Sequence, residues 1–249
     1  VNDDPRSYQW ILFHKVLFDK HPAKTPTYGS VEAVKKFDRR HILDYYESHY
    51  LPNNMIISVV GNVKNAREKI EKHFGRLKPG KRVKRPECHE SVQTKIKKFV
   101  EKRKTFNSYM VVGYKVVPRT HNDSYVFDVI SAVLGRGQSG WMFDEIRSKR
   151  GLAYQVGVNN EHERDYGLFA VYTNLDKKNI GKARDIILQQ FRRSESISEK
   201  DLEEAKTYIE GNNALQMEDN FHKADNYAVW ETIKDARLAG SYIKNIRKV

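Results

Sequence analysis

Residues 141–154, WMFDEIRSKRGLAY, predict a short helix, a glycine joint and a strand in direct succession. Met142, Phe143 and Ile146 are spaced as on one face of a helix. Gly151 follows the last residue of this pattern, at the position where glycine commonly ends a helix. The residues after this glycine alternate between apolar and polar or small side chains, which is typical of a half-buried strand. The stretch therefore predicts a corner at which a helix turns into a strand.

Two side chains that donate hydrogen bonds stand on either side of this joint. Arg147 lies in the last turn of the predicted helix, where a cation suits the negative end of the helix dipole. Tyr154 stands near the start of the predicted strand. Together a guanidinium and a phenol can donate hydrogen bonds to a carbonyl or carboxylate. On residue type alone, a solvated arginine and a core tyrosine explain the pair better, because most such residues are structural.

Length and composition allow one large domain or two modest ones with real cores. The chain has 249 residues, of which 39% are hydrophobic and 11% aromatic. No apolar run approaches the length of a membrane span and no signal peptide is visible, so we expect no membrane partner. The single cysteine, Cys88, excludes an internal disulfide and favours an intracellular compartment, although the sequence leaves the location unknown.

The chain is basic, with 45 Lys and Arg against 32 Asp and Glu and a net charge of +13. Such a charge raises the possibility of nucleic-acid binding. Most of the cations are scattered along predicted helices beside acidic residues, and the exception is the run KPGKRVKR at residues 78–85. A charge run between periodic segments is usually a solvated linker. We therefore expect no nucleic-acid partner and keep that function as the weakest alternative.

Helices and strands come in clusters on both sides of a linker near residues 78–93, which indicates an α+β fold. The predicted helices cover residues 5–17, 39–50, 64–77, 124–134, 177–192, 198–217, 221–233 and 238–249, and a short turn covers residues 31–37. The predicted caps are the acidic start before Pro5, Ser30, Asp38, Asn122 or Asp123, and Ser198 together with Asp201. The predicted strands cover residues 55–60, 94–101, 107–117, 153–161 and 166–175. The first helix is so apolar that we expect it to be buried on most sides.

Two motifs that often carry chemistry give no site here. The glycines of residues 135–140 match G-x-G-x-x-G but follow a helical pattern, so a tight joint between helices explains them better than a dinucleotide site. Neither H-E-x-x-H nor H-x-x-E-H occurs, and residues 88–90, Cys-His-Glu, are adjacent rather than spaced for one face. His41 and His49 stand eight residues apart on one helix and are expected to be solvated or core residues. We predict no metal site in this chain.

The same residues resemble a known family. Gly-x-Gly-x-Ser-Gly at residues 135–140, followed by FDEIRSKRGLAY and a strand, is similar to the second repeat of the insulinase/pitrilysin-type zinc metallopeptidases, which include the mitochondrial processing peptidase. A block earlier in the chain resembles the region after the zinc site in the first repeat of that family. It contains Asp3-Asp4-Pro5, His21-Pro22, Tyr28-Gly29, Phe37-Asp38, Tyr45-Tyr46, Tyr50, Pro52-Asn53-Asn54-Met55 and Val59-Val60-Gly61.

The resemblance implies two related repeats, each a mixed or antiparallel sheet covered by helices. Residues 1–85 would be the C-terminal part of the first repeat, which is then incomplete at its N-terminus. Residues 86–249 would be the N-terminal and middle part of the second, substrate-binding repeat, which is incomplete at its C-terminus. On this interpretation the chain is an internal fragment of a longer protein.

The resemblance also implies a function, that of a zinc-dependent endopeptidase acting on peptides or unfolded proteins. The H-x-x-E-H helix of the family would lie upstream of Val1, so this chain would hold no zinc ligand and no catalytic residue and would be inactive alone. Arg147 and Tyr154 would bind the substrate. The alternative is a non-catalytic partner subunit or scaffold of the same family, and a homodimer or a heterodimer with a family partner is possible in either case.

Overall fold

A three-stranded antiparallel sheet forms the centre of the part of the chain after residue 107. The computed structural model describes residues 3–81, 83, 88, 90 and 92–249. The strands are β1 (Ser108–Val116), β2 (Ala153–His162) and β3 (Gly167–Leu175), in the order β1-β3-β2. The central strand β3 is buried along its whole length except at the half-buried Tyr172. Helices combined with a small antiparallel sheet confirm the α+β class.

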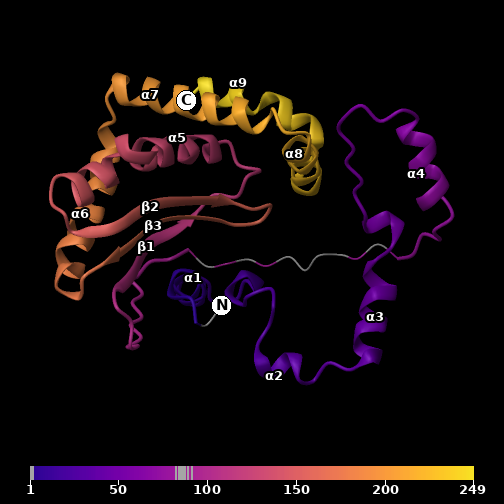
Figure 1. Ribbon diagram of the computed structural model, residues 1–249, viewed down its shortest axis with the longest axis horizontal. Coiled ribbons are helices and arrows are strands. Elements are labelled where there is room, and N and C mark those ends of the chain that lie inside the picture. The colour runs from indigo at the N-terminus through magenta and orange to yellow at the C-terminus, as the bar shows by residue number, and fades with distance from the viewer. Residues whose placement is uncertain (1–2, 82, 84–87, 89, 91) are drawn as a thin grey trace.

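One face of the sheet carries two layers of helices. They are α5 (Asp123–Gly135), α6 (Ile180–Arg193), α7 (Glu199–Gln216), α8 (Asn220–Ile233) and α9 (Tyr242–Arg247). In Figure 1, α5 lies directly over the sheet, and α7 with α9 forms the layer beyond it. The main core lies between the sheet and these helices. Its fully buried side chains include Phe169, Leu134, Met142, Ile146, Leu175, Ile187 and Ile246.

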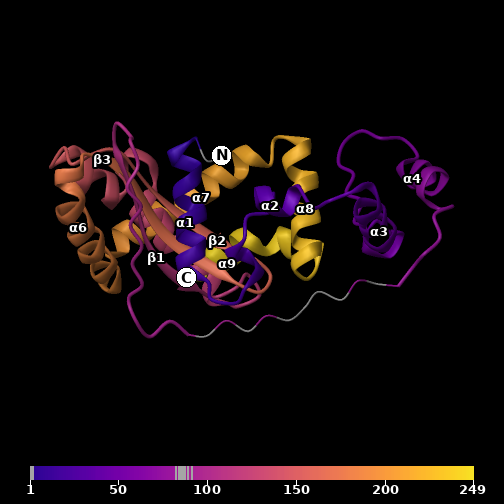
Figure 2. The ribbon, with the colours of Figure 1, turned by 90° about the horizontal axis from the view of Figure 1, so that it is seen from below.

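Helix α1 (Pro5–Leu17) lies against the opposite face of the sheet, as Figure 2 shows from below. Asp4 caps this helix by accepting hydrogen bonds from the next turn, as the Asp-Pro start predicted. The indole of Trp10 meets the ring of Tyr172 on β3 with centroids 5.7 Å apart. The expectation that α1 is buried on most sides is wrong. Most of its residues are only half-buried, because a single side of the helix packs on the sheet.

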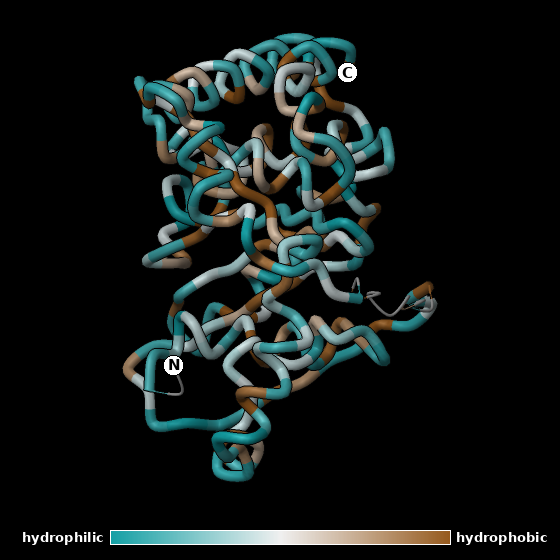
Figure 3. The backbone as a smooth tube through the Cα atoms, turned by 90° about the vertical axis from the view of Figure 1, so that its right-hand side faces the viewer, coloured by the Kyte–Doolittle hydropathy of each residue, from teal (hydrophilic) through white to brown (hydrophobic). Residues whose placement is uncertain are grey.

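The segment between α1 and the sheet contains three helices with no buried residue. They are α2 (Val31–Val34), α3 (Arg39–His49) and α4 (Ala66–Phe74). Figures 1 and 2 both place α3 and α4 apart from the sheet. Figure 3 shows apolar residues in short stretches between polar ones, and no helix in the described residues is long and apolar enough to cross a membrane.

Two predicted strands are absent from the described structure. Residues 55–60 and 94–101 have no regular secondary structure and no strand pairs with either segment among the described residues. Met55, Ile56, Ile57 and Val59 are instead 36–45% exposed. The local sequence sets only the propensity for a strand, whereas a strand also needs a neighbouring backbone for its hydrogen bonds. Both predictions are therefore wrong for this structure.

The predicted helices are confirmed, with shifts at their ends. The predicted short turn at residues 31–37 contains the four-residue helix α2, and the predicted helix 64–77 shortens to α4. The last predicted helix divides into the 3-10 turn η7 (Ala236–Ser241) and α9. The remaining short turns are η1 (Pro22–Lys24), η2 (Pro52–Asn54), η3 (Gly137–Ser139), η5 (Lys177–Asn179) and η6 (Ser194–Ser196). The proposed boundary at residues 85/86 and part of the basic run lie outside the described residues.

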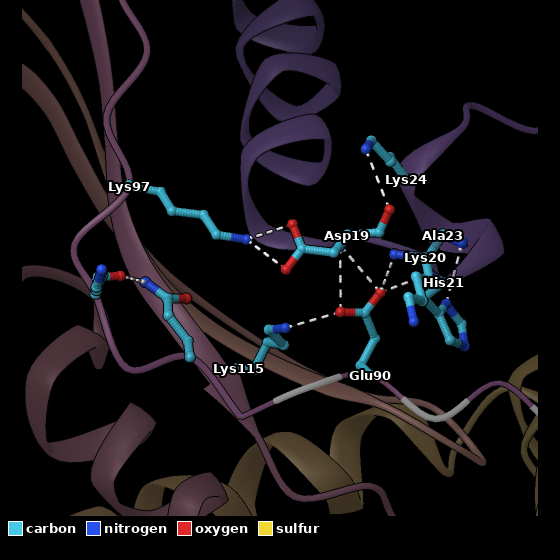
Figure 4. Close-up of polar contacts among 10 residues, drawn as sticks. Asp19, Lys20, His21, Ala23, Lys24, Glu90, Lys97 and Lys115 are labelled. Atoms are coloured by element: carbon cyan, nitrogen blue, oxygen red, sulfur yellow. Dashed lines mark hydrogen bonds and ion pairs between the residues drawn. The ribbon is translucent and has the colours of Figure 1, made fainter.

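A half-buried carboxylate connects three parts of the chain, and we call this group of contacts the Glu90 anchor (Figure 4). The carboxylate of Glu90 accepts the backbone N–H groups of Asp19, Lys20 and His21 at 3.0, 2.5 and 2.5 Å. It also accepts a hydrogen bond from the Lys115 ammonium on β1 at 2.9 Å. Three successive N–H groups form an anion-binding concavity. The anchor holds the turn after α1 against the sheet.

The Glu90 anchor predicts a loss of stability in acid. Burial raises the pKa of Glu90, but the hydrogen bonds from Lys115 and from the three backbone N–H groups outweigh it and lower the pKa from 4.5 to about 2. A depressed pKa stabilises the fold above the unfolded value, and this contribution disappears as the pH falls from about 5 to about 2. We expect the loss to be about 2–3 kcal/mol in the free energy of unfolding.

Denaturant unfolding of Glu90→Gln at several pH values tests this expectation. The variant should be less stable than the parent at neutral pH, and the difference should shrink below about pH 4. Glu195→Gln, which changes an exposed carboxyl on the far side of the sheet, should behave as the parent does. A difference between Glu90→Gln and the parent that stays constant down to pH 2 would contradict the pKa assignment.

Candidate functional site

The helix of the deciding stretch is wound more widely than an α-helix. Residues Phe143–Ser148 form the π-helical turn η4, and the N–H of Lys149 donates to the carbonyl of Asp144, five residues back, at 2.9 Å. Met142 and Ile146 are buried in the main core and Phe143 is half-buried, so the predicted apolar face is confirmed. π-helical turns are rare in proteins, and those that occur are often found at functional sites.

The joint after η4 is held by backbone hydrogen bonds at every step. Gly151 has a φ of +56°, in the left-handed region that glycine adopts without strain. Its N–H donates to the carbonyl of Arg147 at 3.0 Å, and the N–H of Leu152 donates to that of Ile146 at 2.9 Å. The side chain of Asn179 donates to the carbonyl of Leu152 at 3.0 Å. The predicted glycine joint is confirmed.

Strand β2 begins with an irregularity at the position of Tyr154. Ala153 pairs with Leu175 and Gln155 with Asn174, so one extra residue, Tyr154, is inserted between them. Such a bulge turns a side chain out of the regular alternation of the sheet, and bulges are frequent beside active sites. The ring of Tyr154 is 57% exposed, which excludes the alternative of a core tyrosine.

The Arg147 side chain is exposed at the other end of the joint. Its guanidinium lies 5.0 Å from the centroid of the Phe143 ring, at cation–π distance. Neither Arg147 nor Tyr154 forms a side-chain hydrogen bond or ion pair with another described residue. The structure therefore places both donor groups on solvent-facing positions of one short connection, with their hydrogen-bonding capacity unused by the protein.

A second group of residues fixes the chain just before η4, and we call it the Asp201 junction. Asp201, in the first turn of α7, accepts hydrogen bonds from the Arg136 guanidinium at 3.2 Å and from the Trp141 indole at 3.1 Å. Arg136 also donates to Glu204 at 2.7 Å, and its side chain is only 7% exposed. The guanidinium of Arg193 covers the Trp141 ring at 3.8 Å.

Sequence reasoning identified Asp201 only as part of a helix cap. Ser198 and Asp201 do form that cap, since the Ser198 hydroxyl accepts the Asp201 N–H at 3.1 Å. Its partners Arg136 and Trp141 lie 65 and 60 positions away in the sequence, so no local pattern indicated these contacts. Burial raises the pKa of Asp201, and the hydrogen bonds from Ser198, Trp141 and Arg136 outweigh it and lower the pKa.

The glycine motif at residues 135–140 makes the tight joint that its sequence predicted. A Cβ on Gly135 would lie 2.7 Å from the Cβ of Val158, so only glycine lets the end of α5 approach β2 this closely. The chain then passes through η3 to the start of the deciding stretch. The motif therefore positions η4 against the sheet.

The described residues do not fit a zinc site. No group of three or more His, Cys, Asp or Glu side chains among them could hold a metal ion. The ring of His162 is buried and contacts the Val117 carbonyl at 2.7 Å, and burial lowers its pKa against the effect of that hydrogen bond. His41 contacts Asp38 at 2.6 Å, and His49 stacks on Tyr45 with centroids 3.9 Å apart. These histidines have structural partners.

Residues 36–209 match the family model described as the Peptidase M16 inactive domain. The chain belongs to the M16 peptidase family, which confirms the resemblance to the insulinase-type zinc metallopeptidases.

Curated relatives are named zinc proteases. The chain is 26% identical over 222 residues to an uncharacterized zinc protease, YmxG, of Bacillus subtilis, covering 87% of this chain and 53% of that protein. It is 27% identical over 239 residues to an uncharacterized zinc protease of Rickettsia bellii, covering 92% of this chain and 57% of that protein. The chain thus spans little more than half the length of these relatives.

Solved structures share the fold. A crystal structure of a protease from Helicobacter pylori superimposes with a TM-score of 0.91 at 22% sequence identity. The match covers 100% of this chain and 62% of the Helicobacter chain. It includes the segment of α2–α4 as well as the sheet, so the arrangement of the two parts agrees with that structure.

Proposed function

We propose that this chain supplies the substrate-binding half of a zinc-dependent endopeptidase, with Arg147 and Tyr154 binding the peptide. The observation that carries the proposal is the joint between η4 and β2, which presents a guanidinium and a phenol that form no side-chain hydrogen bond or ion pair with another described residue. Membership of the M16 family and relatives named zinc proteases support a peptidase. The proposal includes two related repeats, with residues 1–85 in the first and residues 86–249 in the second.

The chemistry of the pair suits a peptide carbonyl. Arg147 is permanently charged and offers several N–H donors, and Tyr154 adds one O–H donor. Donors fixed in advance stabilise negative charge that develops on a carbonyl oxygen during peptide cleavage. Zinc and its ligands would be supplied by residues upstream of Val1, because the described residues hold no suitable cluster. Arg147 and Tyr154 are then positioning groups for the substrate.

Variants of the longer protein that includes the residues before Val1 test this role. We expect Arg147→Ala and Tyr154→Phe each to lower kcat/KM for peptide cleavage by about 100-fold, with unchanged zinc content. Arg150→Ala is the matched control, because Arg150 is equally close to the joint but already bonded to Glu145. Its turnover should stay near that of the parent. Normal turnover in both site variants would remove the assigned role.

Metal removal tests the class of enzyme. The longer protein should lose peptide cleavage in a chelator and regain it when zinc is restored. The 249-residue chain alone should cleave no peptide under either condition. Cleavage by the longer protein that persists in the chelator, at undetectable zinc content, would exclude a zinc peptidase.

A non-catalytic partner subunit or scaffold is the second candidate. It is favoured by the description of the matching model as an inactive domain. The two candidates differ in one feature of the longer protein, since a peptidase has H-x-x-E-H before Val1 and a scaffold lacks it. Reading the upstream coding sequence distinguishes them. A homodimer or a heterodimer with a catalytic relative would be detected by the mass of the longer protein in solution.

A further inference from the structure

A hollow separate from the Arg147–Tyr154 joint lies between α1 and the hairpin of β2 and β3. Its volume is about 400 Å³. Residues from two distant parts of the chain line it, namely Trp10, His14, Val158, Asn159, Glu161 and Tyr172. It therefore exists only because α1 lies across the face of the sheet, as Figure 2 shows.

Aromatic rings form one wall of this hollow. The indole of Trp10 meets the Tyr172 ring edge to face, with centroids 5.7 Å apart and an interplanar angle of 66°. The His14 ring is held by a contact between its Nδ1 and the Ala23 carbonyl at 2.9 Å. The faces of indole and phenol rings attract cations. A wall of this kind favours a positively charged guest.

A carboxylate without an ionic partner completes the hollow. Glu161 is half-buried, and one of its oxygens accepts the Tyr166 hydroxyl at 2.8 Å. Burial raises the pKa of Tyr166, and the hydrogen bond to Glu161 raises it further, so the phenol remains a donor that orients the carboxylate. Glu161 forms no ion pair with any described residue, although the chain carries 45 Lys and Arg. Its negative charge is available to a ligand.

The strand beside the hollow has a free edge. Within the described residues β2 pairs with β3 alone, so its outer backbone groups face away from the sheet. An extended peptide can pair with such an edge and place alternate side chains over one face of the sheet. Asn159 and Glu161 line the hollow from this edge strand. A strand rises about 3.4 Å per residue, which sets their distance from the bulge at Tyr154.

We propose that this hollow binds the lysine or arginine side chain of an extended peptide that adds to the free edge of β2. The cation lies against Trp10 and Tyr172 and pairs with Glu161. The proposal rests on the proposed peptide-binding function and adds its substrate class, which is a chain with a basic residue about seven positions from the residue held at Tyr154. A carboxylate and two aromatic rings are the chemistry that recognises such a side chain.

Fluorescence anisotropy with the 249-residue chain tests the proposal. The probes are two labelled peptides of ten alanine and threonine residues that carry one central arginine or one central citrulline, which is neutral and of nearly the same shape. We expect the arginine peptide to bind about 10-fold more tightly. Glu161→Gln should abolish this difference. The matched control Glu163→Gln, on the same hairpin but outside the hollow, should retain it.

The outcomes separate this proposal from the one on which it rests. Arg147→Ala and Tyr154→Phe should weaken both peptides by the same factor and leave the 10-fold preference intact. Equal binding of both peptides by the unaltered chain would overturn the cation site while leaving the peptide-binding function in place. Loss of preference in Glu163→Gln as in Glu161→Gln would also overturn it. Binding of neither peptide would overturn both proposals.

Discussion

Asp201→Ala is expected to lower the free energy of unfolding by about 3–4 kcal/mol. The substitution removes the acceptor of three side-chain hydrogen bonds, from Arg136, Trp141 and Ser198. The guanidinium of Arg136 is 7% exposed and would keep only Glu204 as an acidic partner. A buried charge that loses a partner cannot recover its hydration, so the loss exceeds the value of one exposed ion pair.

Denaturant unfolding monitored by circular dichroism measures this loss. Glu203→Ala is the matched control, since Glu203 lies in the same helix and pairs only with Lys206, with its side chain 70% exposed. An exposed pair contributes about 0.2–1 kcal/mol, so the control should change stability little. Equal losses in the two variants would show that Asp201 acts only as a helix surface charge.

The Asp201 junction also connects stability to the candidate site. Trp141 stands two residues before η4, and its indole is fixed by Asp201 on one side and covered by Arg193 on the other. Release of Trp141 should let the start of η4 move and reduce the precision with which Arg147 is placed. In the longer protein Asp201→Ala should therefore lower kcat more than it raises KM.

Phe169→Ala is the second substitution with a large expected effect, about 3–5 kcal/mol in the free energy of unfolding. Phe169 is the third residue of the central strand β3 and is fully buried. Its ring lies 5.9 Å from the ring of Tyr114, 6.2 Å from that of Phe127 and 5.9 Å from that of Phe191. Alanine would leave a cavity between the sheet and the helices that these neighbours cannot fill without moving.

Phe221→Ala provides the same change of side chain at an exposed position. Phe221 is 74% exposed at the start of α8, so its removal should change stability by no more than about 0.5 kcal/mol. Both variants should be compared by denaturant unfolding with a common slope. A similar small effect in Phe169→Ala would mean that β3 is not the centre of the core.

The elements that the sequence predicted well are those whose signals are local. The predicted caps at Asp4, Ser30, Asp38 and Ser198 accept backbone hydrogen bonds, whereas the side chain of Asn122 makes no capping hydrogen bond to α5. Alternation of apolar with polar or small side chains predicted the start of β2, which pairs with its neighbour β3 in one hairpin. Gly151 predicted the joint through its backbone freedom alone.

The elements that the sequence predicted poorly depend on distant partners. Residues 55–60 have the composition of a strand but no strand to pair with in the described structure. The π winding of η4 changes the register of hydrogen bonds without changing the apolar face, so the apolar pattern could not indicate it. Half-burial of α1 follows from its place on the sheet, which its own sequence does not specify.

The candidate site was predictable in part. Arg147 and Tyr154 followed from the family resemblance, and residue types alone favoured a structural interpretation. The bulge that exposes Tyr154 had no sequence signal, because any residue can occupy such a position. The hollow at Glu161 combines α1 with a hairpin more than 140 residues away, so it could be found only from the structure.

The Glu90 anchor holds together the two ends of the segment that contains α2–α4, so this segment forms a large loop closed at its base. Its hydrogen bonds join residues separated by 69 to 71 positions, and both ends meet beside β1. A single cut in the chain between them would consequently leave the first helix seated on the sheet as a bound peptide. The segment of α2–α4 can thus change in length without disturbing the walls of the hollow, because none of the residues that line the hollow belongs to it.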